Sequence, residues 1–237
     1  MIWITADWHF SHDRDFIWQA RGFNSVQEMN ETIVKNYNSL VGEDDDVYVL
    51  GDLMLGGPSA AAGNLRLVSQ MNGRLHLVRG NHDTDTRWRA YAELPNVVEQ
   101  ENAIYLNYNK YHFYLSHFPT LTSNFEDDKK PWQRTLSISG HCHSKNHFNE
   151  GTSFNACVDA WNCRPVQLNE VIKEFDRITK ETWVKKSKEL NSTMRTSRCD
   201  KCVWYKYDCA GPDAYHPGEC PLGHSFKRDP LDGGYYG

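Results

Sequence analysis

The tetrapeptide Gly80-Asn81-His82-Asp83 constrains this chain more than any other stretch. It follows an apolar segment, 75–79, whose composition predicts a buried strand. A glycine at a strand end permits a sharp turn and a close approach of the backbone to a ligand. The turn presents an amide oxygen, an imidazole and a carboxylate at one strand tip. Because binding sites in α/β sheets form at the carboxyl ends of strands, we expect a functional site here.

Other strand ends carry side chains of the same kind. Short apolar segments at 1–6, 47–51 and 136–140 each predict a strand, and a predicted hairpin strand at 111–116 ends in a histidine. A lone Asp-x-His pair is a weak signal, but such groups after several separate strands are hard to attribute to chance. The side chains concerned are Asp7, His9, Asp52, His117, His141 and His143.

Helical patterns alternate with the first three strands. A capping box at Ser25–Glu28 predicts a helix to about residue 40, and 58–71 has helical composition. The β-α-β-α-β order implies a mostly parallel sheet with helices on its faces. Further segments predict strands at 97–98, 103–106 and 154–158 and a closing helix at 168–175.

The bulk properties exclude several classes of protein. The net charge of −5 gives no overall positive field that would attract nucleic acid. No apolar stretch approaches the roughly 20 residues of a membrane helix. The first residues also lack the basic region and apolar run of a secretory signal, so we expect a cytoplasmic protein without a membrane partner.

The strand-end residues form a mixed set of oxygen and nitrogen donors. Such a set suits divalent ions, with Mn²⁺, Fe²⁺ and Zn²⁺ as the candidates. Seven donors are too many for one tetrahedral zinc with an open position, but they fit two ions that share Asp52, each of its oxygens serving one ion. Two ions about 3.5–4 Å apart activate a water and clamp a phosphoryl group. The predicted metal ligands are Asp7, His9, Asp52, Asn81, His117, His141 and His143.

His82 is the predicted general acid. It adjoins the predicted ligand Asn81, and an imidazole with a pKa near about 6.5 suits protonation of a leaving oxygen. Asp83 either orients this imidazole through a hydrogen bond or caps the next turn, and the sequence leaves both roles open.

In order and spacing, five motifs resemble those of the calcineurin-like metallophosphoesterases, over residues 1–175. They are Asp7-x-His9, Gly51-Asp52, Gly80-Asn81-His82-Asp83, His117 and Gly140-His141-x-His143. The segments 7–12, 23–29 and 158–166 are also similar to small bacterial and phage members. Two departures, Ser11 where glycine is common and Cys142 between the last histidines, remove no ligand.

The resemblance implies a four-layer α/β/β/α sandwich and a dinuclear hydrolase of phosphate esters. By resemblance, His82 is the acid. Nucleotides or nucleic-acid ends are the expected substrates of a phosphodiesterase or phosphatase activity, and a catalytically silent scaffold with the same fold is the alternative. The first ion would be held by Asp7, His9, Asp52 and His143, and the second by Asp52, Asn81, His117 and His141.

We expect three regions: a catalytic domain at 1–178, a basic linker at 179–198 and a cysteine-rich module at 199–237. The basic segment reads either as an exposed linker or helix, or as a patch around Lys185, Lys186 and Lys188 that holds polyanions.

Four of the seven cysteines crowd into the tail. A Cys-x₂-Cys pair followed by two further cysteines predicts a closed Cys₄ structural zinc site, made by Cys199, Cys202, Cys209 and Cys220. A tail of 39 residues is too short for an adequate apolar core, so a staple is expected. The alternatives are an iron–sulfur cluster on the same thiolates, disulfides, or His216 or His224 in place of one cysteine.

Overall fold

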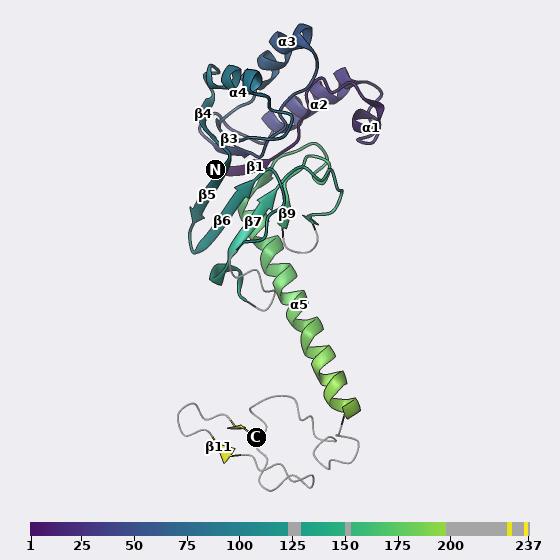
Figure 1. Ribbon diagram of the computed structural model, residues 1–237, viewed down its shortest axis with the longest axis vertical. Coiled ribbons are helices and arrows are strands. Elements are labelled where there is room, and N and C mark those ends of the chain that lie inside the picture. Colours follow the sequence, from purple (N-terminus) through teal and green to yellow (C-terminus); the bar gives the residue numbers. More distant parts are fainter. Residues whose placement is uncertain (123–128, 150–152, 198–226, 229–234, 237) are drawn as a thin grey trace. The chain divides into compact units, whose positions relative to one another are not determined.

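Two mixed β-sheets and five α-helices make up the described part of the chain (Figure 1). The computed structural model describes residues 1–122, 129–149, 153–197, 227–228 and 235–236. The chain divides into two compact units, Met1–Thr179 and Lys180–Gly237. Both sheets just named belong to the larger unit, and a short antiparallel pair, β11 (Lys227–Arg228) with β12 (Tyr235–Tyr236), belongs to the smaller one.

The first sheet has the strand order β10-β1-β2-β3-β4. Strands β1 to β4 run parallel to one another, while β10 pairs antiparallel with β1. The carboxyl ends of the parallel strands therefore meet at one edge, as the alternation of strands and helices predicts. The strands are β1 (Ile2–Thr5), β2 (Asp46–Val49), β3 (Arg74–Val78), β4 (Val97–Glu101) and β10 (Val166–Gln167).

The second sheet has the order β5-β6-β7-β9-β8. The predicted hairpin is confirmed as the antiparallel pair β5 and β6, and β7 and β9 then add in parallel to β6. Because β6 and β7 are parallel, the loops that follow them lie at the same edge of this sheet. The strands are β5 (Ala103–Tyr108), β6 (Tyr111–Ser116), β7 (Thr135–Ser139), β8 (Phe148–Asn149) and β9 (Ser153–Asn155).

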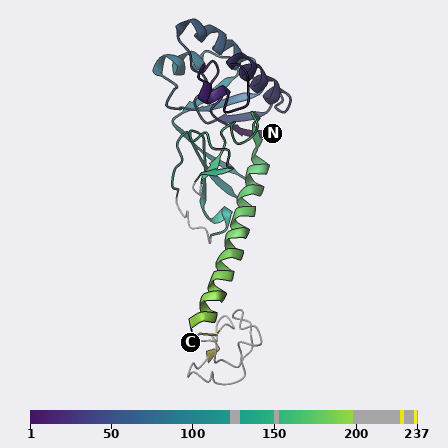
Figure 2. The same ribbon diagram turned by 90° about the vertical axis from the view of Figure 1, so that its right-hand side faces the viewer.

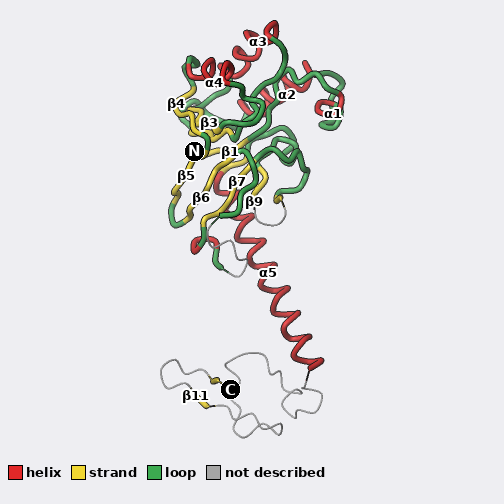
Figure 3. Tube along the Cα trace, viewed as in Figure 1, coloured by secondary structure: helices red, strands yellow, loops and turns green. Residues whose placement is uncertain are grey.

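Four helices lie on the side of the first sheet that faces away from the second sheet (Figure 3). An apolar cluster joins this sheet face to the helices, with Trp8, Met29, Tyr37 and Tyr91 almost completely buried in it. Ser25 caps α2 as predicted by accepting a hydrogen bond from the backbone N–H of Glu28. The helices are α1 (Asp15–Trp18), α2 (Val26–Asn38), α3 (Pro58–Ser69) and α4 (Asp85–Ala92).

A second apolar cluster lies between the two sheets and includes the first turns of α5 (Leu168–Ser197). Up to Thr179, α5 runs beside the second sheet (Figure 2), where Phe175 contacts Phe148 and Phe154. The expected α/β architecture is thus confirmed. Of the expected helical layer on the second sheet, the described residues contain α5 and the short 3₁₀ turn η1 (Pro131–Gln133).

The predicted closing helix at 168–175 proved too short, since α5 continues to Ser197. The basic segment is therefore helical over most of its length, and whether it holds polyanions stays a prediction. Lys185 lies one turn before Glu189, with 3.9 Å between Nζ and Oε1. No helix in the described ranges has the length and apolar character needed to cross a bilayer.

The strand ends approach one another so closely that some positions have no room for a side chain. A Cβ atom on Gly80 would lie 2.2 Å from Asp52 Oδ1 and 2.4 Å from Asp52 N. A Cβ atom on Gly140 would lie 2.4 Å from Asp7 Oδ2. The glycines before the predicted ligands therefore allow the strand ends to approach one another closely. This is a second role, in addition to the sharp turn expected from the sequence.

We expect Gly80→Ala to lower the free energy of unfolding by about 3 kcal/mol or more, because backbone must move to admit the methyl group. Gly63→Ala is the matched control. Gly63 lies in α3 with no atom within 4 Å of the added Cβ, so that variant should gain about 0.5–1 kcal/mol from helix propensity. Urea unfolding of both variants measures this, and equal stabilities would contradict the crowding argument.

Candidate metal centre

The predicted ligands lie in backbone conformations that side chains seldom adopt. Asp7, His9, Asp52, His141 and His143 all have positive φ angles, between 46° and 70°. Residues other than glycine pay about 1–2 kcal/mol for this left-handed conformation, and such strain concentrates at functional sites. The tight turns at these strand ends direct the side chains into one space.

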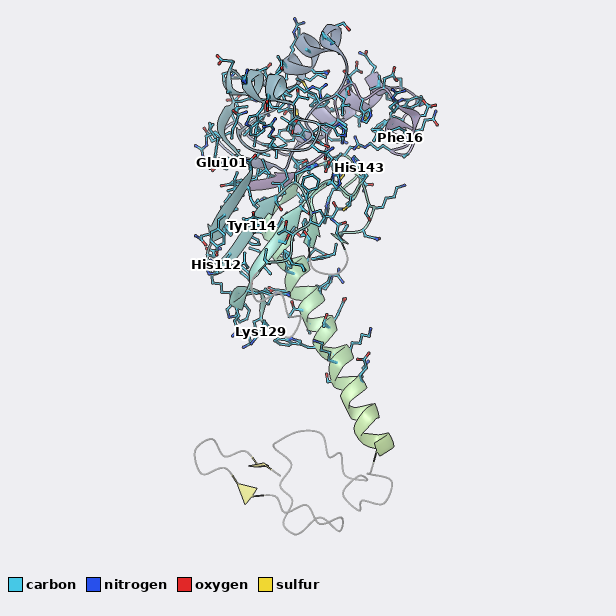
Figure 4. The ribbon with its side chains drawn as sticks, viewed as in Figure 1. Phe16, Glu101, His112, Tyr114, Lys129 and His143 are labelled. Carbon is cyan, nitrogen blue, oxygen red and sulfur yellow. The ribbon has the colours of Figure 1, made fainter. Side chains whose placement is uncertain are left out.

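Four of the predicted ligands form what we call the Asp7 cluster: Asp7, His9, Asp52 and His143. His9 Nε2 lies 3.1 Å from His143 Nε2, 3.6 Å from Asp52 Oδ2 and 3.8 Å from Asp7 Oδ1. Asp7 and His9 are fully buried, whereas His143, labelled in Figure 4 on the loop after β7, is partly exposed.

The Asn81 cluster consists of Asp52, Asn81, His117 and His141. His117 Nε2 lies 2.8 Å from Asn81 Oδ1, 3.3 Å from His141 Nδ1 and 3.5 Å from Asp52 Oδ2. Asn81 Oδ1 is also 3.0 Å from His141 Nδ1. The structure thus brings all seven strand-end ligand candidates together in two groups that share Asp52.

One oxygen of Asp52 faces both clusters. Oδ2 is the atom near His9 and His117, while Oδ1 accepts a 2.8 Å hydrogen bond from the backbone N–H of His82. This differs from the expectation that each oxygen would serve one ion. The difference arises because the turn after β3 passes directly over Asp52 and occupies Oδ1.

The donor set of the Asp7 cluster fits a cation. Asp7 Oδ1 is buried and has no hydrogen-bond partner among the described residues, and burial raises the pKa of Asp7 to about 6. Burial also lowers the pKa of His9, which keeps its imidazole neutral. Two carboxylates and the Nε2 atoms of His9 and His143 converge here, and such a set of donors is satisfied by a divalent ion.

The Asn81 cluster fits a second cation for a similar reason. His117 donates its Nδ1–H to the carbonyl oxygen of Leu50, 2.8 Å away, which leaves the lone pair of Nε2 facing Asn81 Oδ1 and Asp52 Oδ2. A backbone carbonyl on the outer nitrogen is the usual way of orienting a metal-binding histidine.

His82, the predicted acid, lies at the mouth of the centre. Its side chain is 40% exposed, and Nε2 is 3.9 Å from Asp52 Oδ2. Its backbone is fixed on both sides, because its N–H donates to Asp52 and its carbonyl oxygen accepts from Arg87 Nη1 at 2.6 Å.

Neither role expected for Asp83 describes what this residue contacts. Its carboxylate is fully buried and accepts hydrogen bonds from the backbone N–H groups of Asp52, Leu53 and Gly80 and from the Tyr91 hydroxyl, at 2.8–3.3 Å. The cap of α4 is Thr84. Asp83 thus ties the end of β2 to the end of β3 and does not touch the His82 imidazole.

Sequence reasoning did not assign site roles to Arg21 and Asp159. Asp159 Oδ2 lies 3.0 Å from His143 Nδ1, and Arg21 forms a two-point ion pair with the same carboxylate. The segment 158–166 carries part of the family resemblance, which was the only signal for Asp159. Arg21 lies 138 residues away and gave none.

A cavity of about 450 Å³ adjoins the centre. It lies between the loops after β6 and β7, which also carry His117, His141 and His143. Asn149, on its wall, is 9% exposed, and within the described residues its Nδ2 is buried without a hydrogen-bond partner. The lining residues are Pro119, Thr120, Leu121, Cys142, Ser144, Asn146, Phe148 and Asn149.

The predicted tail site lies outside the described residues. Cys199, Cys202, Cys209 and Cys220 all fall in 198–226, so zinc, an iron–sulfur cluster and disulfides remain predictions. Part of the polar loop expected near the site, 123–128, is likewise outside the described ranges.

Comparison with known proteins agrees with this geometry. Residues 1–186 match the family described as calcineurin-like phosphoesterase. An uncharacterized protein of Methanocaldococcus jannaschii is 34% identical over 185 residues, covering 74% of this chain and 92% of the relative. The gene 66 protein of Mycobacterium phage L5 is 26% identical over 205 residues, covering 77% and 97%.

The fold also resembles a solved structure. A protein of unknown function from Aquifex aeolicus superimposes with a TM-score of 0.54 at 22% identity, covering 73% of this chain and 98% of that one. This likeness supports the fold only.

Asp52→Asn should lower the binding of both ions together, because its Oδ2 is the atom that the two clusters share. We expect the Mn²⁺ content of the purified variant to fall from two per chain to one or none. The control is Asp46→Asn. Asp46 lies at the opposite end of β2, where it forms an ion pair with Arg74, so this variant should keep the wild-type Mn²⁺ content. Retention of two ions by Asp52→Asn would remove this residue from the centre.

Proposed function

Because this chain belongs to the calcineurin-like phosphoesterase family, we propose that it hydrolyses phosphate esters with two divalent metal ions. The observation that carries the proposal is the pair of donor clusters that share Asp52 Oδ2. Asp7, His9, Asp52 and His143 would hold one ion, and Asp52, Asn81, His117 and His141 the other. When bound, such ions activate a water and neutralise the charge on a phosphoryl group.

The protein's own groups would supply the proton. The His82 imidazole is solvent-accessible at the mouth and rests on a backbone held by Asp52 and Arg87. This position suits an acid that protonates the leaving oxygen, since a general acid must reach the substrate without large movement.

His12 lies close to both His9 and His82. Its Nδ1 lies 3.3 Å from His9 Nδ1, and its ring centroid is 6.1 Å from that of His82. If His9 offers Nε2 to the centre, its Nδ1–H donates to His12 Nδ1, so the proton of His12 is on Nε2. We assign to His12 the binding of a substrate oxygen.

For the substrate we propose an ester whose organic part is of nucleoside size. The cavity beside the centre has a volume typical of small-molecule sites. Its wall combines apolar Leu121 and Phe148 with the exposed amide of Asn146, which suits a planar ring carrying hydrogen-bonding groups. Exposed Phe118, whose ring packs against His141 at 4.6 Å, adds an aromatic surface next to the Asn81 cluster.

The test of the activity is hydrolysis of p-nitrophenyl phosphate, bis(p-nitrophenyl) phosphate and the p-nitrophenyl ester of thymidine 5′-monophosphate with added Mn²⁺. Turnover of at least one, lost with a chelator and restored by Mn²⁺, supports the proposal. The assay is then extended to a panel of nucleotides and oligonucleotides. If the protein binds two ions but hydrolyses none of these esters, the scaffold alternative is favoured.

His82→Ala should keep both ions but lose about 10²–10⁴-fold in kcat on esters of poor leaving groups. The deficit should shrink for p-nitrophenyl esters, because p-nitrophenolate leaves without protonation. Rates on phenyl and p-nitrophenyl esters of the same phosphate, with metal content as the control, measure this. An equal deficit on both esters would assign a positioning role to His82 instead.

Asn146→Leu should raise KM for the thymidine ester about 2–12-fold, the range for one lost hydrogen bond, and leave KM for p-nitrophenyl phosphate unchanged. Leucine is similar in size to asparagine and the Asn146 side chain is exposed, so thermal stability should not fall. A KM that is unchanged for both esters would exclude the cavity as the binding site of the organic group.

A further inference from the structure

We propose that Arg21 is a positioning residue that holds the Asp7 cluster in its metal-binding geometry, through Asp159 to His143 and directly through the backbone of Asp7. The effect on metal binding rests on the proposed function, whereas the contacts of Arg21 are observed in the structure. We therefore expect the two ions to depend on different supporting residues.

The guanidinium of Arg21 donates hydrogen bonds to several groups beside the Asp7 cluster. Its side chain is 2% exposed, and Nε and Nη2 donate to Asp159 Oδ1 and Oδ2 at 3.0 and 2.8 Å. Nη2 also donates to the Asp7 carbonyl oxygen at 2.9 Å, and Nη1 to the Trp8 carbonyl oxygen at 3.1 Å. These contacts bridge the loop after β1 and the segment after β9, both of which border the Asp7 cluster.

Asp159 transmits this constraint to a ligand. Its Oδ2 accepts from His143 Nδ1 at 3.0 Å, which fixes the imidazole with the lone pair of Nε2 toward His9 and Asp7. Burial acts to raise the pKa of Asp159, but hydrogen bonds from His143 and Arg21 hold it well below its usual range. A carboxylate on the outer nitrogen of a metal-binding histidine makes the imidazole a stronger ligand.

The backbone contact has a separate effect. Asp7 has a φ of 60°, a conformation that costs energy for a side chain of this kind. A hydrogen bond from a buried cation to the Asp7 carbonyl oxygen stabilises the strained turn. Arginine suits the position because one planar group binds the Asp159 carboxylate at two points and still reaches this carbonyl.

A competing interpretation is that His143, Cys157 and Asp159 hold a third ion, since their donor atoms lie within 4.8 Å of one another. The contacts argue against it. Burial raises the pKa of the Cys157 thiol well above its usual range, and Sγ lies 2.7 Å from Asp159 Oδ2, as a donor to it. The Arg21 guanidinium already neutralises the carboxylate, so a cation gains little there. Cys157, Asp159 and Arg21 therefore support His143.

The experiment is a titration of metal-free full-length protein with Mn²⁺ by calorimetry, for wild type, Arg21→Lys, Arg21→Gln and Asp159→Asn. Mn²⁺ is chosen because thiolates prefer softer ions, so the tail cysteines interfere least. We expect one of the two sites to weaken about 10–100-fold in each variant, as is typical when such a support is removed, and the other to keep its affinity.

Two controls separate positioning from general destabilisation. Arg74 and Asp46 form the same two-point ion pair at 2.9 and 2.8 Å on an exposed surface of the first sheet. Arg74→Lys and Asp46→Asn should leave both Mn²⁺ affinities unchanged. In addition, Arg21→Gln combined with Asp159→Asn should weaken binding by less than the product of the two single effects, because both residues act on His143 along one route and only the contact of Arg21 with the Asp7 carbonyl oxygen is separate.

Equal weakening of both sites, additive effects in the double variant, or unchanged affinities would each overturn the inference. Should Arg21→Gln fail to fold, the conservative Arg21→Lys and the nearly isosteric Asp159→Asn still decide it. If wild type binds two Mn²⁺ ions but hydrolyses no ester, the proposed function fails while the titration still tests the role of Arg21.

Discussion

The buried carboxylate of Asp83 is the interaction on which the rest of the centre depends. Removing a carboxylate from water is costly unless hydrogen bonds replace the lost hydration. Asp83 receives them from three backbone N–H groups at the ends of β2 and β3 and from Tyr91 on α4. It thereby fixes two strand ends and a helix at once, and burial raises its pKa despite these donors. With the strand ends locked at this distance, a residue larger than glycine cannot stand at position 80.

This locked frame allows the ligands to remain in unfavourable states. Several of them have left-handed backbone conformations, and in the part of the chain that the structure describes Asp7 Oδ1 has no hydrogen-bond partner. Histidine nitrogens at 3.1 and 3.3 Å face one another in the two clusters. The unpaired oxygen and the facing nitrogens cost free energy in the absence of a cation and are satisfied when one binds, whereas the backbone strain is held by the surrounding structure. Bound metal should therefore stabilise the folded chain by mass action.

The sequence predicted the parts of this arrangement that depend on local pattern. Alternating apolar strands and helices indicated the sheet, and the strand-end residues Asp7, Asp52 and Asn81 lie together because β1, β2 and β3 are parallel and end at one edge of the first sheet. Contacts between distant segments could not be predicted from local pattern. Nothing in the sequence near Arg21 indicates that it pairs with Asp159. The role of Asp83 depends on where β2 ends in space. The length of α5 was missed because its lysine-rich half lacks a core-facing pattern that distinguishes a helix from a linker. The cysteine tail stays a prediction.

The two clusters differ in a way that bears on catalysis. Asp7 and His9 are fully buried and backed by Arg21, whereas Asn81 and His141 are exposed, and His82 lies beside the same mouth. The exposed ring of Phe118 also packs against His141 of the Asn81 cluster. An ion in the Asp7 cluster would exchange slowly because its ligands are preorganised and shielded from water. An ion in the Asn81 cluster would be open to solvent and to substrate oxygens, so under the proposed function the different roles of the two ions would follow from the burial of their ligands.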